Sequence, residues 1–92
     1  MVICKVIGHV WATKKTEDLE GVKLMVVREV HGRKATSVAA DIVGAGIGEQ
    51  VLTVSGSTAR KVFGRDDIPI DMAIVGIIDS CEIVTETGGG RK

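Results

Sequence analysis

The chain has 92 residues, 45% of them apolar, and its 12 basic side chains balance its 12 acidic ones. A chain of this length forms one domain with a small core, because it buries only about two-thirds of its unfolded surface. Its zero net charge and its lack of any Lys/Arg run longer than two disfavour nucleic acid as a partner, and no apolar run reaches the ~20 residues that a membrane span requires.

Residues 2–13 predict a first strand with one face in a core. The even positions are apolar or small, whereas Lys5 and His9 stand at odd positions, which is the period-two pattern of a half-buried strand. Lys5 interrupts the apolar stretch and no small-residue cleavage site follows it, so the segment does not read as a secretory signal. We therefore expect a cytosolic protein.

A polar loop at residues 13–21 precedes a second predicted strand at 22–30, and Gly32 is expected to be the pivot of the hairpin that follows. The third predicted strand, residues 36–43, consists largely of small side chains. Small residues allow a strand, a helix or a second subunit to approach closely. The sequence leaves open which of these covers the third strand.

A fourth strand is predicted at residues 49–56. In the segment STARKVFG that follows, Ser57 is expected to cap a short helix, and Gly64 to end it in the left-handed conformation. Pro69 is expected to open the last element.

Residues 71–84 predict the fifth strand, which is apolar at odd and even positions alike over residues 72–78. Such a strand is covered on both faces, and in so small a domain one cover is expected to be another chain. The pattern predicts an all-β fold, a small five-stranded OB-like β-barrel with one short helix. We interpret residues 1–84 as a single domain and residues 85–92 as a flexible, glycine-rich tail.

Gly44, Gly46 and Gly48 raise the question of a phosphate-binding loop. The dinucleotide fingerprint requires G-x-G-x-x-G between a strand and a helix, whereas here the spacing is G-x-G-x-G and a strand is predicted to follow. No Gly-Lys-Ser/Thr sequence closes a Walker loop either. We therefore expect no nucleotide and no other cofactor.

Cys4, His9, His31 and Cys81 are residue types that zinc accepts, but none of them pair at the short spacings that preorganise a site. Cys4 and His9 would also face opposite sides of the first strand. We interpret both cysteines as reduced, buried thiols and expect no metal site.

Nucleophilic catalysis would require Ser55 or Ser57 to meet a histidine through a tertiary contact, and no nucleophile-elbow motif is present. Asp66 and Asp67 lie in a predicted exposed loop, where carboxylates are normally solvated. We expect no catalytic residue and no enzymatic activity.

Two other functions stay open, an OB-type nucleic-acid binder and a small-molecule or metal-binding domain. Nucleic-acid OB-folds stack bases on exposed aromatic side chains within a basic groove, and this chain offers only Trp11 and Phe63. We favour self-assembly into a cyclic oligomer, because identical subunits that contact head to tail close into a ring.

Three segments, GVKLMVV, VAADIVGAGIGEQVLTVSGSTAR and PIDMAIVGIIDS, closely resemble the EutN/CcmL family of bacterial microcompartment vertex proteins. The resemblance covers residues 2–84 and is most specific over residues 41–60. It implies an OB-like barrel that forms a pentamer, caps the vertices of a cytoplasmic polyhedral shell and contacts its hexameric tiles. The implied function is structural.

The resemblance also implies roles for two groups of residues. The signature loop, expected near the five-fold axis and central opening, contains Gly44, Ala45, Gly46, Ile47, Gly48 and Glu49. The residues expected at or beside the subunit contact are Asp41, Ser55, Gly56, Ser57, Ala59 and Arg60.

Two expectations follow for individual residues of these groups. We expect Arg60 either to pair with Asp41 or Glu49 of an adjoining subunit or to remain solvated. The glycines are expected to omit Cβ atoms where the backbone turns sharply and neighbours crowd, so Gly46→Val should cost at least about 1 kcal/mol if the φ of Gly46 is positive.

Overall fold

The computed structural model describes residues 1–12, 15–33, 35–64 and 67–79. Its strands are β1 (Val2–His9), β2 (Lys23–Glu29), β3 (Thr36–Asp41), β4 (Gln50–Ser55) and β5 (Met72–Ile78). An α-helix, α1 (Ser57–Val62), follows β4, and a 3₁₀ turn, η1 (Glu17–Leu19), precedes β2. No helix in the described part of the chain is long and apolar enough to cross a membrane.

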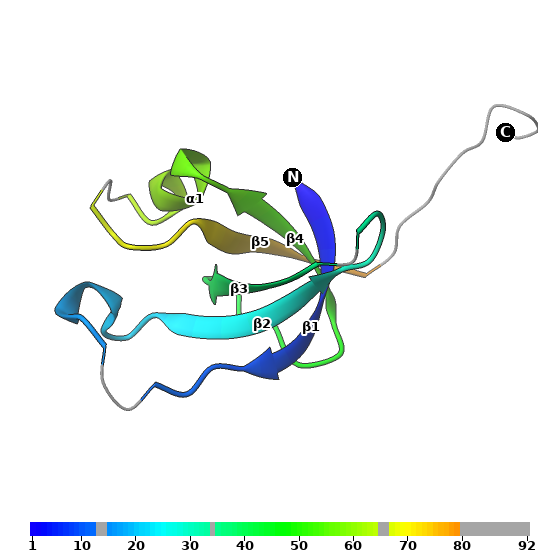
Figure 1. Ribbon diagram of the computed structural model, residues 1–92, viewed down its shortest axis with the longest axis horizontal. Coiled ribbons are helices and arrows are strands. Elements are labelled where there is room, and N and C mark those ends of the chain that lie inside the picture. The colour runs from blue at the N-terminus through cyan, green and yellow to red at the C-terminus, as the bar shows by residue number, and fades with distance from the viewer. Residues whose placement is uncertain (13–14, 34, 65–66, 80–92) are drawn as a thin grey trace, which may run out of the picture.

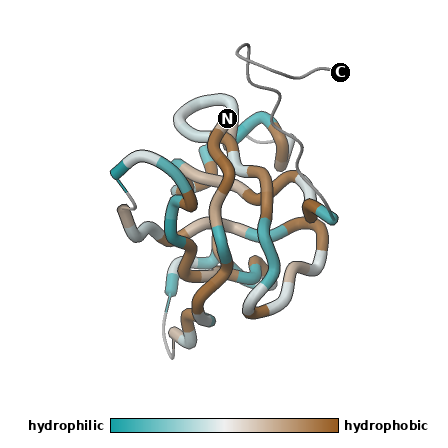
Figure 2. The backbone as a smooth tube through the Cα atoms, turned by 90° about the vertical axis from the view of Figure 1, so that its right-hand side faces the viewer, coloured by the Kyte–Doolittle hydropathy of each residue, from teal (hydrophilic) through white to brown (hydrophobic). Residues whose placement is uncertain are grey.

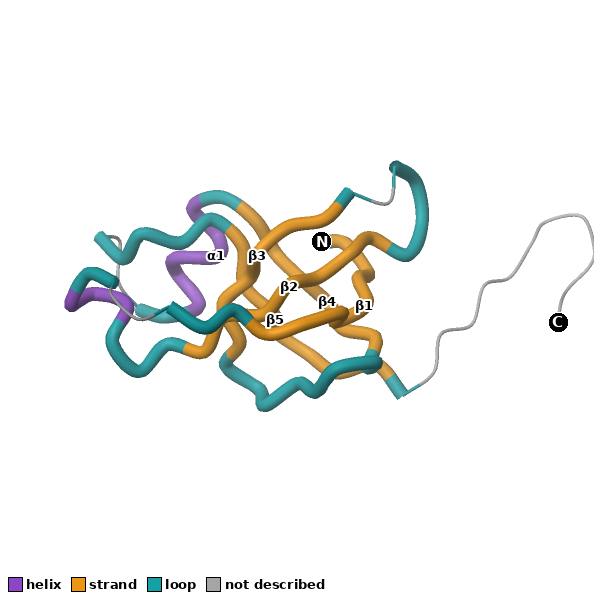
Figure 3. The backbone as a smooth tube through the Cα atoms, turned by 60° about the horizontal axis from the view of Figure 1, so that its bottom comes forward, coloured by secondary structure: helices purple, strands orange, loops and turns teal. Residues whose placement is uncertain are grey.

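The strands close into a barrel in the order β1-β2-β3-β5-β4 (Figure 1). Neighbouring strands are antiparallel except β3 and β5, which pair in parallel through Ala40 with Ala73 and Asp41 with Ile74. Figure 3 shows α1 and η1 at one end of the barrel. The predicted five-stranded OB-like barrel with one short helix is confirmed.

The alternation along the strands builds the main core. Figure 2 shows hydrophobic stretches that recur along the strands with hydrophilic positions between them. The side chains that fill the barrel come from all five strands and from the loop after β3. They are Cys4, Val6, Met25, Val27, Ala39, Ala45, Val51 and Ile74.

The small residues of β3 are covered by the chain itself. Ala39 faces the barrel interior, and its neighbour Ala40 faces outward, because successive strand residues point to opposite faces. Ala40 is nevertheless buried, since Ile68 and Ile70 pack over it in a second cluster. For this strand, the close approach that the sequence predicted is made by the segment before β5.

The face of β5 that points away from the barrel core is only partly covered by the chain. Ala73 is buried against Val54 and Ala59, so α1 lies over the first half of β5. Further along, Ile77 is exposed. The prediction that another chain covers this half stays a prediction.

Several predicted boundaries are wrong. β1 ends at His9 instead of continuing to residue 13: Val10 still donates to the carbonyl of Leu24 at 3.0 Å, but Trp11 points into solvent. β3 ends at Asp41 instead of residue 43, because the Asp41 side chain turns the chain by binding the next amides.

The helix and the last strand also begin differently from the prediction. Gly56, with φ 69°, is the N-cap of α1, and Ser57 is the first residue of the helix instead of its cap. Pro69 does not open β5: it lies in a three-residue turn closed by the Ile70 amide on the Ile68 carbonyl at 2.9 Å, and β5 begins at Met72. Gly64 has the expected positive φ, 71°, and Gly32, the predicted pivot, also has a positive φ, 74°.

Candidate functional site

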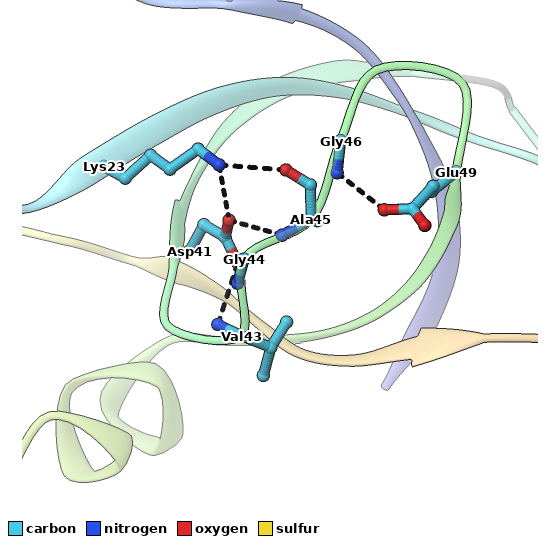
Figure 4. Close-up of polar contacts among 7 residues, drawn as sticks. All are labelled: Lys23, Asp41, Val43, Gly44, Ala45, Gly46 and Glu49. Carbon is cyan, nitrogen blue, oxygen red and sulfur yellow. Dashed lines mark hydrogen bonds and ion pairs between the residues drawn. The ribbon is translucent and has the colours of Figure 1, made fainter.

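The segment between β3 and β4, residues 42–49, is called the β3–β4 loop below, and Figure 4 shows polar contacts that hold it. Its Ala45 is buried in the main core. The loop is also tied to β1, because the Gly48 amide donates to the Val6 carbonyl at 2.8 Å and the Val6 amide donates to the Glu49 carbonyl at 2.9 Å. This loop is therefore an integral part of the barrel.

The carboxylate of Asp41 holds the first half of the β3–β4 loop. Its Oδ1 accepts the amides of Val43 at 3.0 Å and Gly44 at 3.1 Å, and its Oδ2 accepts the amide of Ala45 at 2.7 Å. The side chain has no exposed surface. Hydrogen bonds to an ionised acceptor are stronger than neutral ones, so this carboxylate fixes the turn out of β3.

Lys23 neutralises this buried carboxylate. Its Nζ lies 3.4 Å from Asp41 Oδ2 and donates to the Ala45 carbonyl at 3.0 Å. The lysine comes from the start of β2, which pairs with the end of β3 through Lys23 and Asp41. The sheet register therefore places the cation beside the carboxylate.

The second half of the β3–β4 loop is held by Glu49, whose Oε1 accepts the Gly46 amide at 2.6 Å. Amides of Gly44 and Gly46, which a phosphate-binding loop would present to its ligand, are thus engaged by carboxylates of the same chain. The glycine spacing here serves the loop's own fold.

The three glycines differ in conformation. Gly44 and Gly48 have φ of 84° and 95°, in the left-handed region, whereas Gly46 does not. A Cβ added to Gly46 would lie 3.5 Å from Glu49 Oε1, an ordinary contact. Because the φ of Gly46 is not positive, backbone strain is not expected for Gly46→Val. Gly44 and Gly48 are the two positions whose backbone conformation favours glycine.

Crowding within the subunit does not explain these glycines. A Cβ added to Gly44 or to Gly48 would meet nothing within 4 Å. The expected sharp turns are present at these two positions. The expected crowding by neighbours is not found within the subunit, so it stays a prediction about contacts between subunits.

The β3–β4 loop exposes apolar side chains. Ile47 is 62% exposed, and Ile42, Val43 and the adjacent Ile7 of β1 are also exposed. Hydrogen bonds to Asp41 and Glu49 fix the backbone of the loop, so these side chains stay exposed to water in the single subunit. Exposed apolar side chains on a fixed backbone are available to pack against another protein.

The second predicted group lies at the turn from β4 into α1. Ser55 ends β4, the Gly56 amide donates to the Asp71 carbonyl at 2.8 Å, and Ala59 is fully buried. The absence of a larger side chain at Ala59 lets α1 lie directly on the strands.

Within this subunit, Arg60 binds neither predicted carboxylate. Its guanidinium donates to the Ile70 carbonyl at 3.3 Å, while Asp41 is engaged by Lys23 and by loop amides. Pairing of Arg60 with an adjoining subunit stays a prediction. The exposed carboxylate of Glu49 is the more accessible of the two partners.

The remaining candidates for chemistry are dispersed. Cys4 is a buried free thiol with its Sγ 3.7 Å from Thr53 Oγ1, and burial raises its pKa. His9 is exposed and stacks on Trp11. Among the residues that the structure describes, no three potential ligands gather into a metal site. Cys81, Asp66 and the proposed tail lie outside the described residues.

Sequence reasoning missed the role of Asp41 as the anchor of the β3–β4 loop. An aspartate that precedes a glycine by a few residues at a strand end is a local signal for side-chain bonds to the following amides. Sequence reasoning also missed Lys23, and no local pattern indicates it, because the contact depends on strand register.

Comparison with known proteins gives a consistent result. The family model described as "Ethanolamine utilisation protein EutN/carboxysome" matches residues 1–79. The carboxysome shell vertex protein CcmL of Synechocystis is 44% identical over 89 residues, which cover 92% of this chain and 89% of CcmL. The bacterial microcompartment shell vertex protein GrpN of Rhodospirillum rubrum is 46% identical over 88 residues, covering 91% and 99%.

Solved structures agree. The GrpN pentameric microcompartment shell protein from Rhodospirillum rubrum superposes with a TM-score of 0.80 at 43% identity and covers 91% of this chain and 100% of that one. The structure of Gloeobacter violaceus CcmL gives a TM-score of 0.82 at 37% identity, with 90% of each chain covered.

Proposed function

The chain belongs to the EutN/CcmL family, and on this premise we propose that it is a structural shell protein whose pentamer caps the vertices of a bacterial microcompartment. The observation that carries the proposal is the combination of this barrel with relatives that are shell vertex proteins, one of them pentameric in its solved structure. The work of such a protein is geometric, and it is not an enzyme. It acts in the cytoplasm, within the shell.

The exposed apolar side chains give this assembly a physical basis. Ile47 and Ile77 are exposed to water in the single subunit. Burying apolar surface in a subunit contact stabilises that contact by roughly 25 cal/mol per Å². A ring of identical subunits uses two different patches on each chain, so both can be covered at once.

Two finer statements belong to the same proposal. The β3–β4 loop lies near the five-fold axis and borders the central opening, since it is fixed in shape and apolar at its tip. Asp41, whose side chain is buried in its own subunit, serves the subunit contact through the loop that it holds.

The turn from Ser55 to Arg60 lies at or beside the subunit contact. Arg60 is tested by Arg60→Ala: the proposal expects easier dissociation of the ring on dilution, and Lys61→Ala, one residue further along α1, is the matched control. If the Arg60→Ala ring dissociates on dilution at the same concentration as the wild-type ring, Arg60 does not stabilise the subunit contact. Arg60 is then a solvated side chain that binds only the Ile70 carbonyl.

Hexameric shell proteins are the proposed partners outside the ring. Co-expression with a hexameric tile protein should give closed particles when this chain is present and open sheets or tubes when it is absent. Closed particles of the same size without this chain would count against the capping role.

The two other functions have separate tests. Binding to single-stranded DNA that weakens steeply with salt would indicate a nucleic-acid binder, and folding that is lost on chelation would indicate a metal-dependent domain. We expect neither behaviour.

A further inference from the structure

A groove lies beside the β3–β4 loop, at the end of β1 and the start of β2. Its volume is about 230 Å³. The side chains that matter for its chemistry are His9, Trp11, Lys15, Val22, Lys23 and Leu24.

Trp11 forms an exposed wall of this groove. The indole is 86% exposed and stacks on the ring of His9, with 5.2 Å between ring centroids and 21° between planes. The stack holds the indole in one orientation, so less entropy is lost when a partner packs on it. An ordered, exposed tryptophan beside a groove is the kind of residue that dominates binding energy at protein interfaces.

The remainder of the groove is apolar with a positive rim. Val22 and Leu24 contribute apolar surface, and Lys15 contributes an exposed ammonium group. Lys23 contributes its aliphatic stem, because its Nζ is bound to Asp41 and to the Ala45 carbonyl. The groove therefore fits an apolar side chain with a carboxylate close by in sequence.

The β3–β4 loop presents such a segment. Ile47 is the most exposed apolar side chain of that loop, and Glu49, two residues further on, carries an exposed carboxylate. We propose that Ile47 of each subunit inserts into the Trp11 groove of the next subunit around the ring, with Glu49 facing Lys15. This inference rests on the proposed ring and names the two surfaces that meet in it.

Position within the subunit supports this pairing. Lys23 lines the groove and also binds Ala45 of the β3–β4 loop, so groove and loop are neighbours on one chain. Rotation about an axis displaces a point in proportion to its distance from that axis. Two neighbouring patches can therefore meet across copies only close to the axis, where the β3–β4 loop is proposed to lie.

Trp11 is the only tryptophan of the chain, so its fluorescence reports directly on the groove. In the intact ring, the emission should be blue-shifted and quenching by acrylamide several-fold weaker than in dissociated subunits. Ile47→Asp should weaken the ring at least about tenfold and return the emission of Trp11 to that of a water-exposed indole. Val38→Asp, on the exposed outside of β3, is the matched control and should leave that emission unchanged.

Cross-linking gives an independent test. Oxidation of an Ala12→Cys/Ile47→Cys double variant, with Cys81→Ser, should yield covalent oligomers up to five subunits, because Ala12 lines the groove. Ala12→Cys/Val38→Cys, in the same background, should not. The native thiol of Cys4 is buried and should not contribute.

The outcomes separate this inference from the function on which it rests. A wild-type ring in which Trp11 remains fully water-exposed, or a ring of the Ala12→Cys/Ile47→Cys variant that does not cross-link on oxidation, overturns the groove contact and leaves the proposed ring in place. A wild-type chain that forms no ring overturns the proposed function itself.

Discussion

Replacing Asp41 with alanine should destabilise the barrel by about 2–6 kcal/mol, because one buried carboxylate holds three consecutive loop positions. The Ala45 amide is buried with the loop, and leaving it without an acceptor costs about 1–3 kcal/mol. The amides of Val43 and Gly44 belong to exposed residues and regain water in part, so each costs about 0.5–1.5 kcal/mol.

The ion pair is the smaller contribution. The Lys23 side chain is 41% exposed, and pairs of that kind are screened and contribute at most about 1 kcal/mol. Lys23→Met keeps the aliphatic stem and removes the charge, so it is the matched variant. The comparison separates the hydrogen bonds of Asp41 from its charge pairing.

Urea unfolding followed by circular dichroism measures both variants, at one protein concentration, since association would otherwise add to the apparent stability. We expect the loss of unfolding free energy to be several times larger for Asp41→Ala than for Lys23→Met. Equal losses, or an Asp41→Ala loss below about 1 kcal/mol, would refute the conclusion that this carboxylate fixes the β3–β4 loop.

Gly48→Ala should cost about 1 kcal/mol or more, because its φ of 95° strains an L-residue, whereas Gly46→Ala should stay within about 0.5 kcal/mol of wild type for the subunit; equal costs in urea unfolding would contradict this distinction. Cys4 should resist alkylation in the native state and react on unfolding; fast native labelling would contradict its burial. Burial raises the pKa of Cys4, so stability should fall as pH rises above about 8.5, where the unfolded thiol ionises and the folded thiol stays neutral. In Cys4→Ala, this contribution to the fall in stability with pH should be absent. If the slope of unfolding free energy against pH is the same as in the wild type, other groups cause the fall.

The strands of the barrel could be predicted because burial of one face imposes a period of two on the sequence. Cys4 and Val6 are buried and Lys5 between them is exposed, as their positions predict. Strand ends were predicted less well. Nothing in the apolar pattern after Asp41 shows that its side chain will turn the chain, since Ile42 and Val43 continue the pattern.

The conformations of the loop glycines could not be predicted from spacing. Gly44, Gly46 and Gly48 look alike in the sequence, yet Gly44 and Gly48 have a positive φ and Gly46 does not. Their amides bind Asp41, Glu49 and the Val6 carbonyl, respectively, and these partners are set by the fold. The groove beside the loop is equally unpredictable from sequence, because strand register brings its two walls together.

The oligomeric state in solution tests the central claim most directly. Light scattering coupled to size exclusion, or native mass spectrometry, on the purified 9.7 kDa chain at micromolar concentration and without ligand should give a closed species of five subunits. A monodisperse, fully folded monomer under the same conditions would contradict the proposed shell-vertex function.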